Sequence, residues 1–212
     1  MSKTLYINGE WKTPVDGHTW DVISPADGHV VATVAEATGA DVELAITAAR
    51  NAFDHGVFPN WGFVKRSALV SKIADLMERD LNILAKLESD DTGKRLIEAE
   101  YDIADVIACF RHFAEMGKKQ HEREVNVGLE HVDSRVVHEA VGVCTLIGPW
   151  NYPLLQVSWK VAPALIAGCT FIVKPAELTP SSAIHLFKLI DEAGVPAGVA
   201  NLILGKGSAI GD

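Results

Sequence analysis

The chain has 212 residues, of which 48% are hydrophobic, and a chain of this length and composition can bury a sizeable core. Its formal net charge is -9 and its 19 Lys and Arg residues form no basic stripe, so we expect no nucleic acid among its partners. No apolar run approaches the roughly 20 residues of a membrane-spanning helix. Because the amino terminus also lacks the apolar core of a signal peptide, we expect a cytoplasmic protein with no membrane partner.

The amino-terminal segment is predicted to form β-hairpins that pack on a larger unit. Turn signals such as Asn8-Gly9 and Asp27-Gly28 separate short β-rich pieces at 5–7 and 30–34. Three helices are predicted to follow. The first has Asp41 as its N-cap and stops at Gly56, and the others cover about 65–90 and 96–116, where apolar residues keep helical spacing.

Residues 118–140 are predicted to form a protruding β-ribbon, because a charged run is followed by β-branched residues that alternate with polar ones. Beyond it the chain alternates strand and helix, with strands at 141–147, 170–173 and 200–204. Short connections between such units imply right-handed crossovers, so the predicted fold class is α/β, with a Rossmann-like parallel sheet and flanking helices. Pro163 lies inside the first predicted crossover helix, 154–167, and predicts a kink or two short pieces.

A loop rich in Gly and Pro follows the first strand of this unit, and its sequence is Ile147-Gly148-Pro149-Trp150-Asn151-Tyr152-Pro153. Ligands of open α/β sheets bind at the carboxyl ends of the strands, which is where this loop begins. The side-chain amide of Asn151 can donate a hydrogen bond there to a developing oxyanion. Taken alone, Asn151 is more typical of a turn former and Trp150 of a packing residue.

A cation and a carboxylate three residues apart follow the next strand, in the run Lys174-Pro175-Ala176-Glu177. The ammonium can donate to the hydroxyl oxygens of a ribose diol, and the carboxylate can accept from its hydroxyl hydrogens. A solvated charge pair ahead of a helix is the alternative when this run is taken alone. The placement of both loops on one rim favours a shared ligand site.

The glycine run from Gly205 to Gly211 resembles a dinucleotide fingerprint whose last glycine comes one residue too late, because position 210 is Ile. Gly207 still allows close backbone approach to a cofactor at a helix start. The three cysteines, Cys109, Cys144 and Cys169, have no CxxC spacing, and their apolar neighbours favour burial over a nucleophilic role. The histidines lack ligand spacing, so no metal site is predicted.

The ordered motifs of the chain resemble the amino-terminal half of an NAD(P)-dependent aldehyde dehydrogenase, with a lean toward the betaine-aldehyde oxidisers. The resemblance covers essentially the whole chain. It includes the segments that begin at Tyr6, Ser24 and Trp159, as well as the loops at Ile147 and Lys174.

The resemblance implies a role for each of these motifs. Asn151 would donate to the oxyanion of the thiohemiacetal and thioester steps, and Lys160 matches a lysine implicated in proton relay in some members. NAD would be favoured over NADP, because the carboxylate that holds the ribose would repel a 2'-phosphate. Asp91 matches a position near a monovalent-cation site in some members, or it is an ordinary helix-end residue. The implied cofactor-binding set is Ile147, Gly148, Pro149, Trp150, Lys174, Pro175, Ala176, Glu177, Gly207 and Gly211.

Family members continue into a catalytic domain with a nucleophilic cysteine and a general-base glutamate, and none of the three cysteines here matches that nucleophile. We therefore expect that the catalytic domain is absent, that the chain alone is inactive, and that the complete enzyme takes a small-molecule aldehyde and forms a homo-oligomer. The expected division is a cofactor-binding domain in two segments, 1–117 and 141–212, with an oligomerisation ribbon at 118–140. The alternatives are a non-catalytic dinucleotide-binding or subunit-interaction module, and a remnant that folds poorly because sheet edge and apolar surface are open.

Overall fold

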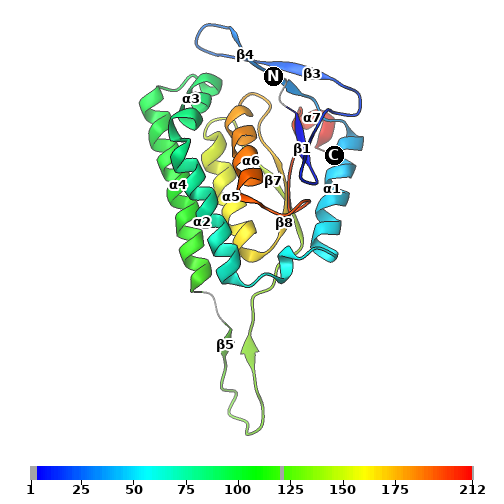
Figure 1. Ribbon diagram of the computed structural model, residues 1–212, viewed down its shortest axis with the longest axis vertical. Helices are drawn as coiled ribbons and strands as arrows, with labels where there is room; N and C mark the ends of the chain where they lie inside the picture. The colour runs from blue at the N-terminus through cyan, green and yellow to red at the C-terminus, as the bar shows by residue number, and fades with distance from the viewer. Residues whose placement is uncertain (1–3, 120–121, 212) are drawn as a thin grey trace.

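The computed structural model describes residues 4–119 and 122–211 of the chain, and they form a layered α/β fold (Figure 1). A five-stranded sheet has the strand order β2-β1-β9-β8-β7. Its strands are β1 (Leu5–Ile7), β2 (Glu10–Lys12), β7 (Val143–Ile147), β8 (Thr170–Lys174) and β9 (Ala200–Leu202). The pairs β7–β8 and β8–β9 are parallel, so the predicted parallel sheet is confirmed.

Helices cover both faces of this sheet. α1 (Gly39–Asp54) contacts β7, β8 and β9, and α5 (Pro153–Ala167) and α6 (Ser181–Ala193) contact the strands from the other side (Figure 1). A second helical layer packs outside α5 and α6. It consists of α2 (Phe63–Arg79), α3 (Leu81–Thr92) and α4 (Leu96–Lys118). The core between the layers includes fully buried Phe110, Phe171 and Phe187.

The two amino-terminal hairpins belong to different sheets. β1 and β2 join the main sheet, because Tyr6 of β1 pairs antiparallel with Leu202 of β9. Their turn is Asn8-Gly9, and both residues have positive φ, 55° and 78°, as a tight hairpin turn requires. β3 (Thr19–Ile23) and β4 (Val30–Ala35) form a separate two-stranded sheet.

The start of α1 corrects one prediction. The N-cap is Thr38, not Asp41, because the Thr38 side chain accepts from the Asp41 backbone N–H and the Asp41 carboxylate accepts from the Thr38 N–H at 2.8 Å. This reciprocal pair is a capping box, in which the acidic residue stands at the third helical position. The helix ends at Asp54 with His55 as its C-cap, so it also stops before Gly56.

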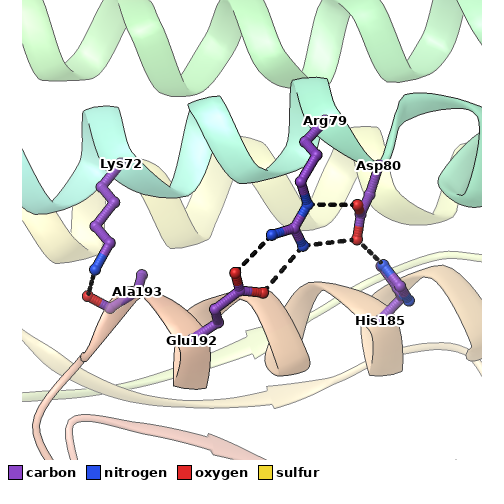
Figure 2. Close-up of polar contacts among 6 residues, drawn as sticks. All are labelled: Lys72, Arg79, Asp80, His185, Glu192 and Ala193. Carbon is purple, nitrogen blue, oxygen red and sulfur yellow. Dashed lines mark hydrogen bonds and ion pairs between the residues drawn. The ribbon is translucent and has the colours of Figure 1, made fainter.

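The single helix predicted at about 65–90 is two helices, α2 and α3, which break at Asp80. A polar cluster at this break ties α2 to α6 (Figure 2). The Asp80 carboxylate accepts from Arg79 and lies 2.8 Å from His185 Nε2, while Arg79 also donates to Glu192. Lys72 Nζ donates to the carbonyl of Ala193 at 3.0 Å, where a cation suits the carboxyl end of α6. Apolar spacing continues through the break, so periodicity alone did not reveal it.

Two further elements bear on the predictions. α5 continues from Pro153 to Ala167 with Pro163 inside it, so the helix is not divided into two pieces. Buried Val161, Ala162 and Leu165 hold this turn against the core, and packing therefore outweighs the lost backbone donor. The remaining short helices are a 3-10 turn (Phe58–Asn60) and α7 (Gly207–Ile210).

The predicted ribbon projects from the body beyond the end of α4 (Figure 1). Its strands, β5 (Arg123–Glu124) and β6 (Arg135–Val136), pair antiparallel. Residues 120 and 121 of the predicted ribbon lie outside the described residues, as do the chain-end residues 1–3 and 212 of the two predicted cofactor-domain segments. In the described part of the chain, none of the helices has the length and apolarity needed to cross a membrane.

Candidate functional site

The two loops that the sequence singled out leave the sheet side by side. β7 and β8 are parallel neighbours in which Ile147 is the partner of Lys174, so both loops start at the same height of the sheet. The Gly148 N–H donates to the Lys174 carbonyl at 2.9 Å, which extends the pairing by one step into the loops. The structure therefore places both loops on one rim, at the carboxyl ends of adjacent strands.

Gly148 lets the first loop pass close to α5. A Cβ atom added at this position would lie 2.8 Å from Val157 Cγ2, a distance that real Cβ atoms essentially never show. After Gly148 the chain turns through Pro149 and Trp150, and Pro153 then begins α5. The loop is thus a tight strand-to-helix connection, and a side chain at Gly148 would force the loop or Val157 to shift.

The side chains of this loop face outward. Ile147 is 60% exposed and Trp150 is 62% exposed, and together they offer an apolar surface beside the rim. Asn151 is exposed as well, while its backbone carbonyl accepts a hydrogen bond from Lys94 Nζ at 3.3 Å. An open cavity beside Asn151 is lined by Lys94, Glu98, Tyr101, Asp102, Asn151 and Tyr152. Asn151 therefore borders an open space of the chain.

The second loop holds its cation inside and its carboxylate toward solvent. Lys174 is only 8% exposed, and its Nζ lies 3.4 Å from the Pro175 carbonyl and 3.8 Å from Glu177 Oε2. These contacts are long, so the ammonium keeps capacity for a stronger acceptor. The backbone carbonyl of Glu177 accepts a hydrogen bond from Trp20 Nε1 of β3 at 3.2 Å, and the Glu177 side chain stays partly exposed. A polar ligand between ammonium and carboxylate would match this arrangement.

The structure places the remaining predicted site residues on α5, on and beside α7, and in the rim loops. Lys160 lies on α5 and donates to the Gln156 carbonyl of its own helix at 2.9 Å. Gly207 begins α7, and a side chain there would meet no atom of the chain within 4 Å. Gly211 is confined, because a Cβ would lie 2.5 Å from the Gly207 carbonyl oxygen. Ala176 and Pro149 are half-buried, and Pro175 is buried, so these three shape the backbone of the loops.

Two buried acidic residues of α3 cap the helices that follow the loops. Sequence reasoning missed Glu88, and it placed Asp91 near a monovalent-cation site or at an ordinary helix end without this contact. Glu88 Oε1 accepts from the Leu154 N–H at the start of α5, at 3.2 Å. Asp91 Oδ2 accepts from the Ser181 N–H at the start of α6, at 2.8 Å. Their signal in the sequence is an acidic pair three residues apart on the apolar face of a helix that also buries Leu84.

Burial raises the pKa of Glu88 to about 7, although Ser182, the Leu154 N–H and Lys94 each favour its charged form. Burial likewise raises the pKa of the Cys109 and Cys144 thiols, and the neighbouring Cys169 raises that of Cys144 further. Cys169 is buried as predicted, whereas Cys109 and Cys144 are only half-buried. Among the described residues no group of His, Cys, Asp and Glu has the arrangement to hold a metal ion.

Comparison with known proteins identifies the family. The sequence profile described as "Aldehyde dehydrogenase family" matches residues 11–212, which is nearly the whole chain. The chain belongs to the aldehyde dehydrogenase family. The family predicted from the ordered motifs is therefore confirmed, and the two loops of the rim lie inside the matched region.

Individual members of the aldehyde dehydrogenase family align with the chain from end to end. Betaine aldehyde dehydrogenase of Bacillus subtilis is 46% identical over 212 residues, which are 100% of this chain and 43% of that protein. Human retinal dehydrogenase 2 is 43% identical over 209 residues, which are 98% of this chain and 40% of that protein. The chain thus spans about two fifths of the length of these relatives.

A solved structure of the family has the same fold. The crystal structure of betaine aldehyde dehydrogenase from Staphylococcus aureus in complex with NAD+ matches with a TM-score of 0.96 and 43% identity. The match covers 100% of this chain and 42% of that one. The aldehyde dehydrogenase fold therefore extends through the whole described part of the chain, including the ribbon and both loops.

Proposed function

We propose that this chain is the NAD-binding and oxyanion-stabilising part of an enzyme that oxidises an aldehyde to a carboxylic acid. The observation that carries the proposal is the pairing of Ile147 with Lys174, which places the amide-bearing loop and the cation-carboxylate loop on one rim. Family membership and the NAD+ complex of the Staphylococcus aureus relative support it. The rest of the reaction would need the cysteine that family members carry outside this region.

The residues at the rim fit a nicotinamide dinucleotide. The Lys174 ammonium and the Glu177 carboxylate would hold the ribose hydroxyls, since one donates and the other accepts. Ile147 and Trp150 would provide apolar contact to a ring, and Gly207 and Gly211 would allow the backbone to approach. Gly148, Pro149, Pro175 and Ala176 would fix the shape of the two loops. When bound, NAD+ would supply the acceptor for the hydride that leaves the aldehyde carbon.

Asn151 would stabilise the developing negative charge on the substrate oxygen by donating from its side-chain amide. Its position at the open cavity beside Tyr152 supports this role. Lys160 would take part in moving a proton, which requires its ammonium to leave the Gln156 carbonyl that it contacts here. The betaine aldehyde dehydrogenases among the similar proteins favour an aldehyde of that class as the substrate.

Alone, the 212 residues would not oxidise an aldehyde. The thiols of Cys109 and Cys144 have raised pKa values and Cys169 is buried, so the described thiols are poor nucleophiles at neutral pH. Free thiols also suit the cytoplasm, which we propose as the location. The ribbon would bridge subunits of a homo-oligomer. Formation of NADH by the isolated chain with any aldehyde would contradict the proposal that the nucleophilic cysteine lies outside this region.

The ribose assignment is tested by measuring NAD and NADP affinities of the wild type and Glu177→Ala by isothermal titration calorimetry. Loss of a charged hydrogen bond should weaken NAD binding roughly 10-fold or more. The variant should also bind NADP relatively better, because the charge that repels a 2'-phosphate is gone. Glu43→Ala, on the exposed face of α1, is the matched control and should change neither affinity. Equal NAD affinities of wild type and Glu177→Ala would remove the ribose assignment.

A further inference from the structure

The loop that carries Asn151 is held from two sides by residues of α3 and of the turn that follows it. Glu88 is fully buried in α3, and Lys94 comes directly after Gly93, which ends α3 with a φ of 75°. Neither residue belongs to the rim itself. Both nevertheless reach the backbone of the segment that leads into α5.

Glu88 caps α5 from a different helix. The first N–H groups of an α-helix have no partner within the helix, and a side-chain oxygen usually satisfies one of them. In α5 the N-cap residue Tyr152 makes no such side-chain bond. Glu88 Oε1 accepts from the Leu154 N–H at 3.2 Å instead, so the start of α5 is fixed to α3.

Lys94 holds the loop one step earlier, at Asn151 itself. Its Nζ donates to the Asn151 carbonyl at 3.3 Å and forms an ion pair with Asp102 Oδ2 of α4 at 2.5 Å. The same ammonium lies 4.7 Å from the ring centroid of Tyr152, within the range of a cation-π contact. The Lys94 and Asp102 side chains are only 14% and 15% exposed. The pair is therefore a mostly buried, directed contact with less screening than a surface ion pair.

These contacts matter because the side chains of the loop do not anchor it. Trp150, Asn151 and Tyr152 are all exposed, so core packing does not fix their backbone. An amide that stabilises transient charge must already point at the substrate oxygen, within about 0.5 Å of the productive position. The contacts to the Asn151 carbonyl and the Leu154 N–H restrict the backbone on either side of that amide.

We propose that Lys94 and Glu88 are positioning residues for Asn151, which act by fixing the loop backbone before substrate arrives. This inference rests on the proposed oxyanion role of Asn151, and neither residue touches the reacting atoms. A purely structural Lys94 would stabilise α4 through Asp102 and leave the motion of the loop unchanged. The two roles therefore predict different effects of losing Lys94. A positioning role predicts more motion of the backbone at Asn151, and a purely structural role predicts a change in α4 alone.

The test is NMR relaxation on the 15N-labelled chain without cofactor, comparing wild type with Lys94→Met. The backbone order parameter of Asn151 should fall from about 0.85, typical of rigid backbone, to below about 0.6. Residues in α4 next to Asp102 should keep their order, and the melting temperature should confirm that the fold is intact. Lys86→Met is the matched control, because Lys86 of α3 pairs with Asp90 at the exposed surface. An unchanged order parameter at Asn151 in folded Lys94→Met would overturn the proposal.

Glu88 is tested by Glu88→Gln, which keeps an oxygen acceptor for Leu154, and Glu88→Leu, which removes it. The Leu variant should lower the order of the Asn151, Tyr152 and Leu154 amides, and the Gln variant should keep it at the wild-type value. If Glu88→Leu and Glu88→Gln give the same order at these residues, the part assigned to Glu88 is wrong. Should the Leu variant unfold, Lys94→Met decides the part assigned to Lys94, and amide hydrogen exchange of Leu154 in the wild type decides the part assigned to Glu88. A protected Leu154 N–H is expected, and an unprotected one would overturn that part. Because no cofactor is present, these results are independent of the Glu177→Ala titration that tests the proposed function.

Discussion

The burial of Glu88 makes the stability of the folded chain depend on pH. Its carboxyl group is enclosed by α3, α5 and α6, near the Leu154 N–H, Ser182, Lys94 and Asp102, and burial raises its pKa from 4.5 to about 7. In the folded chain it is therefore protonated over a pH range in which the unfolded chain is ionised. Below about 4.5 the protonated form predominates in both states, so its contribution to stability is fully present there.

The free energy of unfolding should consequently fall as the pH rises from about 4.5 to about 7 and then level off, by about 3 kcal/mol in total for this group. Glu88→Gln cannot ionise, so it should lose this component of the slope and be more stable than wild type above pH 7. Urea unfolding at pH 5 and pH 8 measures the effect. The exposed Glu43→Gln serves as the control, and equal pH slopes for Glu88→Gln and wild type would contradict the raised pKa.

At the scale of elements, the strand-to-helix connection depends on Gly148. Replacement by Ala puts a Cβ 2.8 Å from Val157 Cγ2, so the loop or α5 must move. We expect Gly148→Ala to destabilise the chain by about 1–3 kcal/mol, as overpacking generally does, and to weaken NAD binding further because the loop is displaced. Thermal melts and calorimetric titration measure the two effects separately.

Two further variants test whether crowding at Val157 causes the effect of Gly148→Ala. Gly39→Ala, in the first turn of α1 where an added Cβ meets no atom within 4 Å, should change stability much less. The double variant Gly148→Ala with Val157→Ala removes the close contact and should recover NAD affinity relative to Gly148→Ala alone. Failure of the double variant to recover any affinity would show that the crowding at Val157 is not the cause.

The elements themselves could largely be predicted because their signals are local. The alternation after residue 141 and the turn residues of the rim loops gave the order of strands and helices and the common rim. The break at Asp80 could not be read from periodicity, because buried residues continue at helical spacing on both sides of it. Glu88 and Lys94 were missed because their partners are 66 and 57 residues away in the sequence. Such contacts exist only once the fold brings the end of α3 and the turn after it to the start of α5.

On the scale of the whole molecule, the ribbon stands out because β5 and β6 pack mainly against each other and project from the body (Figure 1). Its strands have two residues each, and an isolated two-stranded ribbon is marginally stable in water. It nevertheless exposes apolar side chains, with Leu129 at 66% and Val132 at 51%. Apolar groups on an extension that projects from the body favour a role in subunit contact (Figure 1).

The double variant Leu129→Ser with Val132→Ser should therefore reduce self-association without weakening the fold. We expect its sedimentation profile to shift toward the monomer relative to wild type at equal concentration, because apolar contact area between subunits is lost. Its melting temperature, measured in a dilute sample where both proteins are monomeric, should match wild type, since neither side chain belongs to the core. Val64→Ser removes a similarly exposed apolar group from α2 and should leave association unchanged. Identical sedimentation of wild type and the ribbon variant at all concentrations would contradict a bridging role.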